Sequence, residues 1–250
     1  MELGLDGKTA LVTGASAGLG REIAQHLAAE GVKLCIAARR QELLDTLASQ
    51  IVTAGRQRPH IVTIDLMQED APQKLAREAL KRLGRIDILI HCAGGSSKMS
   101  IDSPEEKWQD TVTMKYTRVR QLTLAVLAGM IEHRWGRIIN ISGKSEPVEL
   151  LSATPANGAW HAFAKALSRE VGKHGVTVNS IAPGLIMSEQ IRRRHSEQYM
   201  SERASREIPV GRYGEPKELA CVAAFLASPL ASYITGAIIP VDGGLRRFAF

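Results

Sequence analysis

Residues 9–20 read Thr-Ala-Leu-Val-Thr-Gly-Ala-Ser-Ala-Gly-Leu-Gly. The apolar residues 10–12 predict a strand that stops at a glycine-rich turn, after which a helical pattern begins. Gly14 allows a sharp turn, Gly18 removes a side chain that would block a phosphate, and Gly20 lets the helix pack closely on the sheet. The first N–H groups of that helix and its positive dipole end would face an anion. The stretch therefore predicts a dinucleotide-binding loop.

Three glycines alone would also fit an ordinary structural turn. The sequence on either side of the loop distinguishes between these two interpretations. An amphipathic segment with Ile23, Ala24, Leu27 and Ala28 follows the loop. A second apolar run at 34–38 comes next, which completes a βαβ unit of the expected length. The context favours dinucleotide binding.

Along the whole chain, apolar runs alternate with helical patterns. We expect an α/β fold with a Rossmann-type doubly wound parallel sheet of about seven strands and helices on both faces. Residues 1–250 are expected to form a single domain, in which the long irregular connection at 184–212 supplies a substrate lid near 185–212. Strands are expected at 8–13, 33–38, 60–64, 86–92, 136–142, 176–181 and 236–240, and helices near 18–30, 40–54, 70–83, 105–133, 152–173 and 214–228.

Composition excludes several classes of protein. The 250 residues are 44% hydrophobic, which fits one larger α/β domain. The chain has no stretch of the ~18 apolar residues that a membrane span needs and does not begin like a signal peptide, so we expect a cytoplasmic protein with no membrane partner. The cysteines at 35, 92 and 221 lack metal-type spacing and are expected to be reduced thiols.

The formal charge of +6 does not indicate a nucleic-acid partner. Lysine and arginine are spread along the chain, with one compact run at 192–194, and aromatic residues make up 4% of the chain, too few for a base-stacking surface. A solvated basic surface is the simpler interpretation, and an acidic substrate is the more specific one.

The end of the second expected strand indicates which nicotinamide cofactor the chain binds. A carboxylate at this position would hydrogen-bond the ribose hydroxyls and repel a 2′-phosphate. Here Ala38 is followed by Arg39 and Arg40, which leaves room and positive charge for the phosphate and favours NADP(H). The alternative is that both arginines begin the next helix on its solvated face. Ala17, inside the glycine loop, supplies no second basic group.

Several motifs together resemble the short-chain dehydrogenases/reductases of the single-domain, 3-oxoacyl-ACP-reductase-like branch. They are Thr13-Gly14-Ala15-Ser16-Ala17-Gly18-Leu19-Gly20, Asp65-Leu66, His91-Cys92-Ala93-Gly94 in place of the family's usual Asn-Asn-Ala-Gly, Asn140-Ile141-Ser142, Val178-Asn179 with Pro183-Gly184, and Gly236 with Val241-Asp242-Gly243-Gly244. The resemblance spans residues 7–244. With the arginines above, it implies these cofactor-binding residues: Gly14, Ser16, Ala17, Gly18, Leu19, Gly20, Arg39, Arg40, Asp65, Leu66, Cys92, Ala93, Gly94, Pro183, Gly184 and Ser188.

The resemblance also implies where catalytic residues should lie. The family uses a tyrosine acid, a lysine four residues later, a serine that orients the substrate and an asparagine that holds a relay water. At the family's usual spacing the tyrosine position falls on Ala153 and the lysine position on Asn157. The serine position falls on Gly143, one residue after Ser142, and the asparagine position falls on Lys115. We therefore expect Ser142 and Lys115 to carry any catalysis, with Lys144 near them. The alternative for Lys115 is a salt-bridged replacement of a lost relay.

Two other arrangements are less favoured. His161 and Lys165 imitate the tyrosine–lysine spacing on one helix face. Accepting them would require deleting about two turns of helix before Val178, so an ordinary helix face is preferred. Tyr116 adjoins Lys115 but is expected to pack between helices.

Two functions from different classes follow. The first is an NADP(H)-dependent oxidoreductase acting on a carbonyl or alcohol, with acidic and acyl-carrier-bound compounds among the candidate substrates. The alternative is a catalytically impaired NADP(H)-binding sensor or partner subunit of the same fold. The resemblance implies a homo-oligomer, a tetramer formed through the segments 105–133 and 152–173 and the C-terminal strand. The apolar tail Phe248-Ala249-Phe250 agrees with burial in such an assembly.

Overall fold

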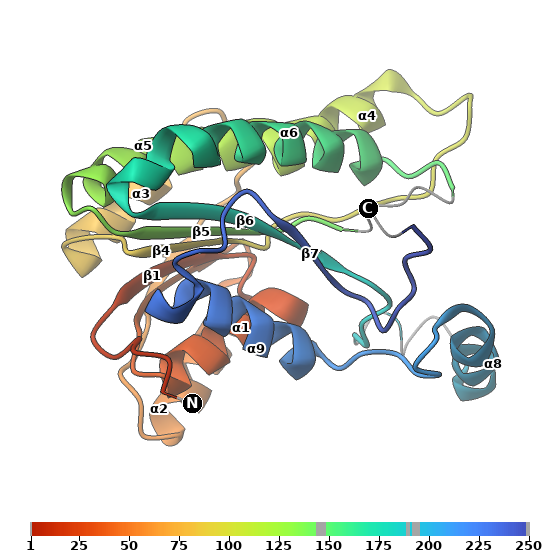
Figure 1. The fold of residues 1–250 in the computed structure, drawn as a ribbon, viewed down its shortest axis with the longest axis horizontal. Helices are drawn as coiled ribbons and strands as arrows, with labels where there is room; N and C mark the ends of the chain where they lie inside the picture. The colour runs from red at the N-terminus through yellow and green to blue at the C-terminus, as the bar shows by residue number, and fades with distance from the viewer. Residues whose placement is uncertain (1, 144–148, 189–190, 192–195, 249–250) are drawn as a thin grey trace.

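The computed structural model describes residues 2–143, 149–188, 191 and 196–248. Its centre is a seven-stranded sheet in the order β3-β2-β1-β4-β5-β6-β7 (Figure 1), and every neighbouring pair is parallel. The chain order reverses between β1 and β4. The strands are β1 (Thr9–Thr13), β2 (Lys33–Ala38), β3 (His60–Thr63), β4 (Ile88–His91), β5 (Gly136–Ile141), β6 (Val176–Pro183) and β7 (Ile238–Val241).

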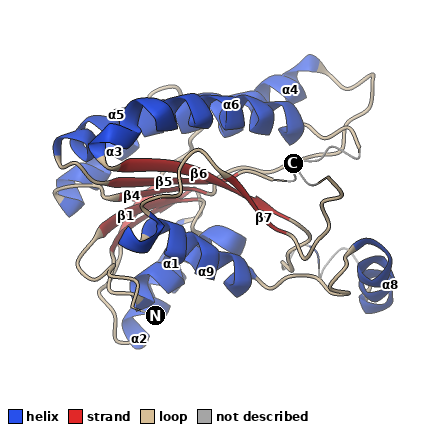
Figure 2. Cartoon of the chain, in the orientation of Figure 1, coloured by secondary structure: helices blue, strands red, loops and turns tan. Residues whose placement is uncertain are grey.

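Helices cover both faces of the sheet, as the sequence predicts (Figure 2). One layer holds α3 (Ala71–Leu83), α4 (Glu105–Val112), α5 (Arg118–Glu132) and α6 (Ala153–Val171), and the other holds α1 (Gly18–Ala29), α2 (Gln41–Thr53) and α9 (Pro216–Ala227). Helix α8 (Glu197–Glu207) stands beside these layers. Single 3-10 turns lie at Gly172–His174 and Pro229–Ala231.

The central strands are apolar because both of their faces are buried. In β1, Val12 packs in the cluster beneath α1 and α9, whereas the adjacent Leu11 packs in the cluster beneath α3, α5 and α6. Ile138 and Ile139 divide in the same way in β5. Successive side chains of a strand point to opposite faces, so a strand with helices on both sides needs an unbroken apolar run.

Two segments differ from the sequence prediction. The helix expected at 105–133 is interrupted by a π-helix at Thr113–Thr117, which separates α4 from α5. The connection at 184–212, expected to be irregular, contains α8. The Ser196 side chain caps that helix by accepting a hydrogen bond from the N–H of Tyr199 at 3.2 Å. Among the described residues, no helix has both the length and the apolar character needed to cross a membrane.

A buried polar contact joins β4 to the helices above it. His91, at the end of β4, is 2% exposed, and its Nε2 lies 2.8 Å from the Thr123 hydroxyl of α5. The ring also meets Trp160 of α6 edge-on, with centroids 5.7 Å apart. Burial lowers the pKa of His91 from 6.5 to about 3, so the imidazole is neutral at pH 7.

We predict that this histidine makes the fold sensitive to acid. Below pH 6.5 the unfolded chain protonates His91, whereas the folded chain does not until about pH 3. The contribution to stability is therefore complete above pH 6.5 and is lost as the pH falls through that window, about 2 kcal/mol between pH 7 and pH 5. Urea unfolding at both pH values measures this loss, and His91→Asn should reduce it. An equal loss in the variant would contradict the assignment.

Candidate functional site

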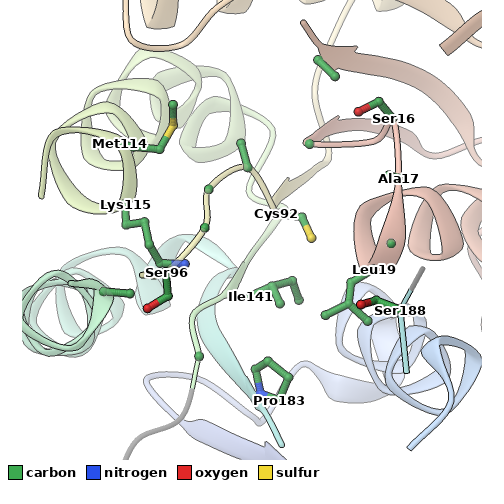
Figure 3. A pocket seen from close by; sticks show the side chains of 18 of the residues that line it. Ser16, Ala17, Leu19, Cys92, Ser96, Met114, Lys115, Ile141, Pro183 and Ser188 are labelled. Carbon is green, nitrogen blue, oxygen red and sulfur yellow. The ribbon is translucent and has the colours of Figure 1, made fainter. Parts of the chain in front are cut away.

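A cavity of about 1100 Å³ opens at the carboxyl ends of the strands, where the strand order reverses. In open α/β sheets this position is where ligands bind. The cavity brings together nearly all the residues expected at a site (Figure 3). Those that line it are Gly14, Ser16, Ala17, Gly18, Leu19, Arg39, Arg40, Asp65, Leu66, Cys92, Ala93, Gly94, Lys115, Ser142, Pro183, Gly184 and Ser188. Gly20 does not line the cavity.

The glycine loop fits closely between β1 and β4. Gly14 has φ +68°, and a Cβ there would lie 2.7 Å from the backbone of Cys92 and Ala93. A Cβ on Gly20 would lie 2.5 Å from the carbonyl oxygen of Gly14, so both positions exclude a side chain for reasons of packing. Gly18 also has a positive φ, +57°, but the space beside it is open. The loop therefore presents bare backbone toward the cavity at Gly18.

The start of α1 is suited to an anion. The residue that precedes the helix, Ala17, makes no side-chain cap, and the first turn contains no acidic residue. The first N–H groups of a helix have no partner within it, and together with the helix dipole they favour a phosphate.

Two arginines lie where β2 ends. Arg39 and Arg40 follow Ala38 and are exposed at the cavity rim, and the Arg40 guanidinium donates to the Ser16 hydroxyl at 3.2 Å. Asp65 lies across the rim after β3, where its carboxylate accepts from the N–H of Met67 at 3.0 Å. The end of β2 thus offers guanidinium groups and no carboxylate, which suits a phosphorylated ribose.

The π-helix places Lys115 in the opposite wall of the cavity. Its side chain extends toward Ser96 (Figure 3) and passes close to Gly94, where a Cβ would lie 3.0 Å from the lysine Cγ. Burial lowers the pKa of Lys115. It has no ion-pair partner among the residues that the structure describes. A lysine of this kind is a strong hydrogen-bond donor and a tunable proton donor.

A thiol faces the same cavity. Burial raises the pKa of Cys92 to about 12, and the nearby Lys115 opposes this shift only in part. Cys92 is therefore a neutral, unreactive group near neutral pH.

The other positions at which the resemblance predicts catalytic groups also line this wall. Ala153 and Asn157, on α6, line the cavity beside Gly143. The Ser142 hydroxyl reaches the cavity wall but donates to the backbone oxygen of Ile181 at 3.2 Å. Lys144 lies outside the described residues. The wall thus presents Lys115 as its cationic proton donor among the described residues, with Ser142 engaged in the sheet.

The less favoured candidates do not line the cavity. Neither His161 nor Lys165 lines the cavity, and the Lys165 ammonium lies near Gly236. Tyr116 meets Phe163 edge-on at 6.4 Å, as expected for packing between helices.

Sequence reasoning missed several lining residues, and some of them carried a detectable signal. Glu215 and Pro216 begin α9 with a capping box, which is a recognisable helix start. Leu151 enters through an antiparallel bridge with Lys98, which no local pattern encodes. The missed lining residues are Arg21, Glu22, Ala37, Ile64, Gly95, Ser96, Met114, Leu151, Thr154, Met187, Glu215 and Pro216.

A doubly wound parallel sheet with a glycine loop at its switch point defines a dinucleotide-binding protein. A family model described as enoyl-(acyl carrier protein) reductase matches residues 14–246. The chain is 35% identical to 3-oxoacyl-(acyl-carrier-protein) reductase FabG of Aquifex aeolicus (strain VF5) over 98% of this chain and 100% of that protein. It therefore belongs to the short-chain dehydrogenase/reductase family, and is similar to its 3-oxoacyl-ACP-reductase branch.

Other relatives agree in sequence and in structure. The FabG of Vibrio cholerae is 34% identical over 97% of this chain and 99% of that protein. L-sorbose reductase of Gluconobacter frateurii, solved with NADPH and L-sorbose, superposes with a TM-score of 0.92 at 28% identity, covering 99% of this chain and 100% of that chain.

The glycine loop yields a matched pair of variants. Gly18→Ala introduces strain from the positive φ alone, about 1–2 kcal/mol, and should lower the Tm by a few degrees. Gly14→Ala adds a collision with the backbone after β4, so it should lower the Tm by clearly more. Thermal unfolding by circular dichroism measures both, and equal losses would show that the loop does not depend on this close approach.

Proposed function

We propose that this chain is an NADP(H)-dependent oxidoreductase that interconverts a carbonyl and an alcohol, with Lys115 in place of the family's proton donor. The observation that carries the proposal is the partly buried Lys115 side chain in the cavity wall, with a lowered pKa and no described ion-pair partner. Its position on the π-helix brings the side chain beside Gly94, in the cavity that Asn157 also lines.

The cofactor proposal rests on the charges at the end of β2. Arg39 and Arg40 would pair with the 2′-phosphate, the backbone at Gly18 would face the pyrophosphate, and Asp65 would lie near the adenine. The relatives support this choice, because two solved neighbours are a reductase complexed with NADPH and a reductase named as NADPH-dependent.

The proposed mechanism assigns separate tasks to the cofactor and the chain. The bound nicotinamide would supply the hydride. Lys115 would donate a hydrogen bond to the substrate oxygen, stabilise its developing negative charge and transfer a proton to it. A lowered pKa favours that transfer, because it brings the ammonium closer to the working pH. Ser142 would support the wall from its bond to β6.

The cavity also bears on the class of substrate. A cation at its wall that has no ion-pair partner among the described residues favours a substrate that carries negative charge. This agrees with the acyl-carrier-protein-linked carbonyls named for the FabG relatives. Residues 185–212, with α8 in this segment, would form the lid over that substrate.

We further propose a single domain that acts in the cytoplasm as a homotetramer, in which the exposed Phe248 is covered. Residues 249–250 of the apolar tail lie outside the described residues.

A second candidate function is favoured by the residues on α6. Ala153 and Asn157 occupy the positions of the family's tyrosine and lysine, and neither side chain can take over the tyrosine's proton transfer. A protein that binds NADP(H) without turning it over, as a sensor or partner subunit, would retain the glycine loop and Arg39 while losing that pair.

Replacing Arg39 by aspartate tests the cofactor assignment. The change replaces attraction of the 2′-phosphate by repulsion, and charged hydrogen bonds of this kind contribute about 1.5–3 kcal/mol. NADPH affinity should fall by roughly 10-fold to 100-fold while NADH affinity changes little. Fluorescence titration of both cofactors measures this difference. Equal affinity of the wild type for the two would refute the choice of NADP(H).

Lys115→Met tests catalysis. General acid catalysis is typically worth ~10²–10⁴-fold, so kcat for NADPH oxidation against a panel of carbonyls should fall by that order while the NADPH Kd stays nearly constant. Ser142→Ala should cause a smaller loss. The measurement is initial-rate kinetics beside a binding titration of the same samples.

The same assay separates the two candidate functions. NADPH binding without turnover on any carbonyl or alcohol would establish the sensor or partner subunit. The double variant Ala153→Tyr with Asn157→Lys restores the family's tyrosine and lysine at these two positions. Increased carbonyl reduction in this variant would show that α6 presents both positions to the nicotinamide. Native turnover that survives Lys115→Met would refute the role of Lys115.

A further inference from the structure

Helix α6 carries two buried polar atoms that the proposed mechanism does not use. The Asn157 Oδ1 and the His161 Nε2 are both inaccessible to solvent, and neither has a hydrogen-bond partner among the described residues. The two side chains are four residues apart, so they lie on one face of the helix. Buried polar atoms in native proteins are nearly always paired with protein or with an ordered water.

Lys115 lies near this pair of atoms. Helix α6 packs against the π-helix that carries Lys115, and Asn157 and Lys115 line the same cavity. The positive charge of Lys115 also reaches His161, because it adds to the effect of burial in lowering the pKa of the imidazole. His161 is therefore neutral at pH 7, with one ring nitrogen that donates and one that accepts.

Among the described residues, few charges shift the pKa values of Lys115 and His161. Lys115 is the one described charge that shifts the pKa of His161. Cys92, which follows β4, is the one that shifts the pKa of Lys115, and its thiol is itself protonated. Lys165, one turn beyond His161, is directed toward Gly236 and takes no part.

Two unpartnered polar atoms of α6 are thus buried near a lysine of the π-helix that packs against this helix. The amide oxygen accepts a hydrogen bond, the imidazole nitrogen does either, and the lysine ammonium donates. A buried water needs two to four polar partners of this kind. We propose that Lys115, Asn157 and His161 hold one internal water, and that His161 returns a proton to Lys115 through it after each turnover. This inference rests on the proposed reductase function.

The protons balance over one cycle. The hydride adds to the carbonyl carbon, and Lys115 transfers one proton to the carbonyl oxygen, which leaves a neutral amine. The water protonates that amine and takes a proton from the His161 Nε2. The ring takes a proton from solution at Nδ1, and the exchange of tautomers restores the N–H at Nε2. The net uptake is one proton from solution. His161 touches neither substrate nor cofactor and acts through Lys115 as a positioning residue.

The test compares His161→Gln with His133→Gln, a matched change at an exposed histidine on the end of α5. His161→Gln should lower kcat about 10-fold to 100-fold and leave the KM for NADPH unchanged. His133→Gln should change neither. In His161→Ala, added imidazole should restore kcat in proportion to its neutral form, so the rescue grows as the pH rises through the pKa of imidazole. A purely structural histidine would not produce this rescue.

A second measurement does not depend on turnover. Histidine C2–H resonances are titrated by NMR in the wild type and in Lys115→Met. Besides His91, one further histidine should titrate below 6.5 in the wild type, and its pKa should rise when the lysine cation is removed. This experiment tests the contact between His161 and Lys115 without any His161 variant, so it still gives a result if those variants do not fold.

The outcomes distinguish the two proposals. Turnover that is unchanged in His161→Gln, or a titration that is unchanged in Lys115→Met, overturns the relay and leaves the reductase function standing. Absence of turnover in the wild type overturns the reductase function, and the relay with it. Loss of kcat, rescue by imidazole and the shifted titration together support the relay.

Discussion

The close approach of two backbones at the centre of the sheet is the constraint on which the rest of the structure depends. The turn at Gly14 meets the chain after β4 with no room for a side chain. The Thr13 hydroxyl reinforces this contact by donating to the Ile90 carbonyl at 3.3 Å and accepting from the N–H of Cys92 at 3.2 Å. Because these strands are adjacent at the point where the order reverses, their contact fixes the floor of the cavity. The other walls are set by elements that pack around it.

The fold could be predicted from the sequence because its decisive signals are local. Apolar runs flanked by helical periodicity encode strands buried on both faces, and the glycine spacing encodes the turn. The π-helix at Thr113–Thr117 could not be predicted in this way. An extra residue in a turn changes the helix phase but leaves the composition intact, so 105–133 still has the pattern of one helix. The start of α8 did carry a local signal, a serine cap before Glu197, within a segment whose polarity resembles a loop.

The cavity's two halves differ in how well the sequence predicts them. The half around the glycine loop is made of backbone and small residues, whose roles depend on φ and on space. The residue types in the sequence are therefore enough to predict this half of the site. The half around Lys115 depends on which side chains meet across three separate elements. Sequence spacing placed Lys115, Ala153 and Asn157 at the wall, and the structure brings them together. The partnership between Lys115 and His161 depends instead on burial and charge, which no linear pattern contains.

The bare start of α1 has a consequence for the lifetime of the protein. With no side-chain cap and no acidic residue in its first turn, this helix gains its missing hydrogen bonds when an anion docks there. A ligand that binds only the folded chain stabilises it by RT ln(1 + [L]/Kd). Proteases that attack the opened chain would then remove the ligand-free molecules first. The abundance of this protein would accordingly follow the supply of its dinucleotide, whether or not each molecule completes a reaction.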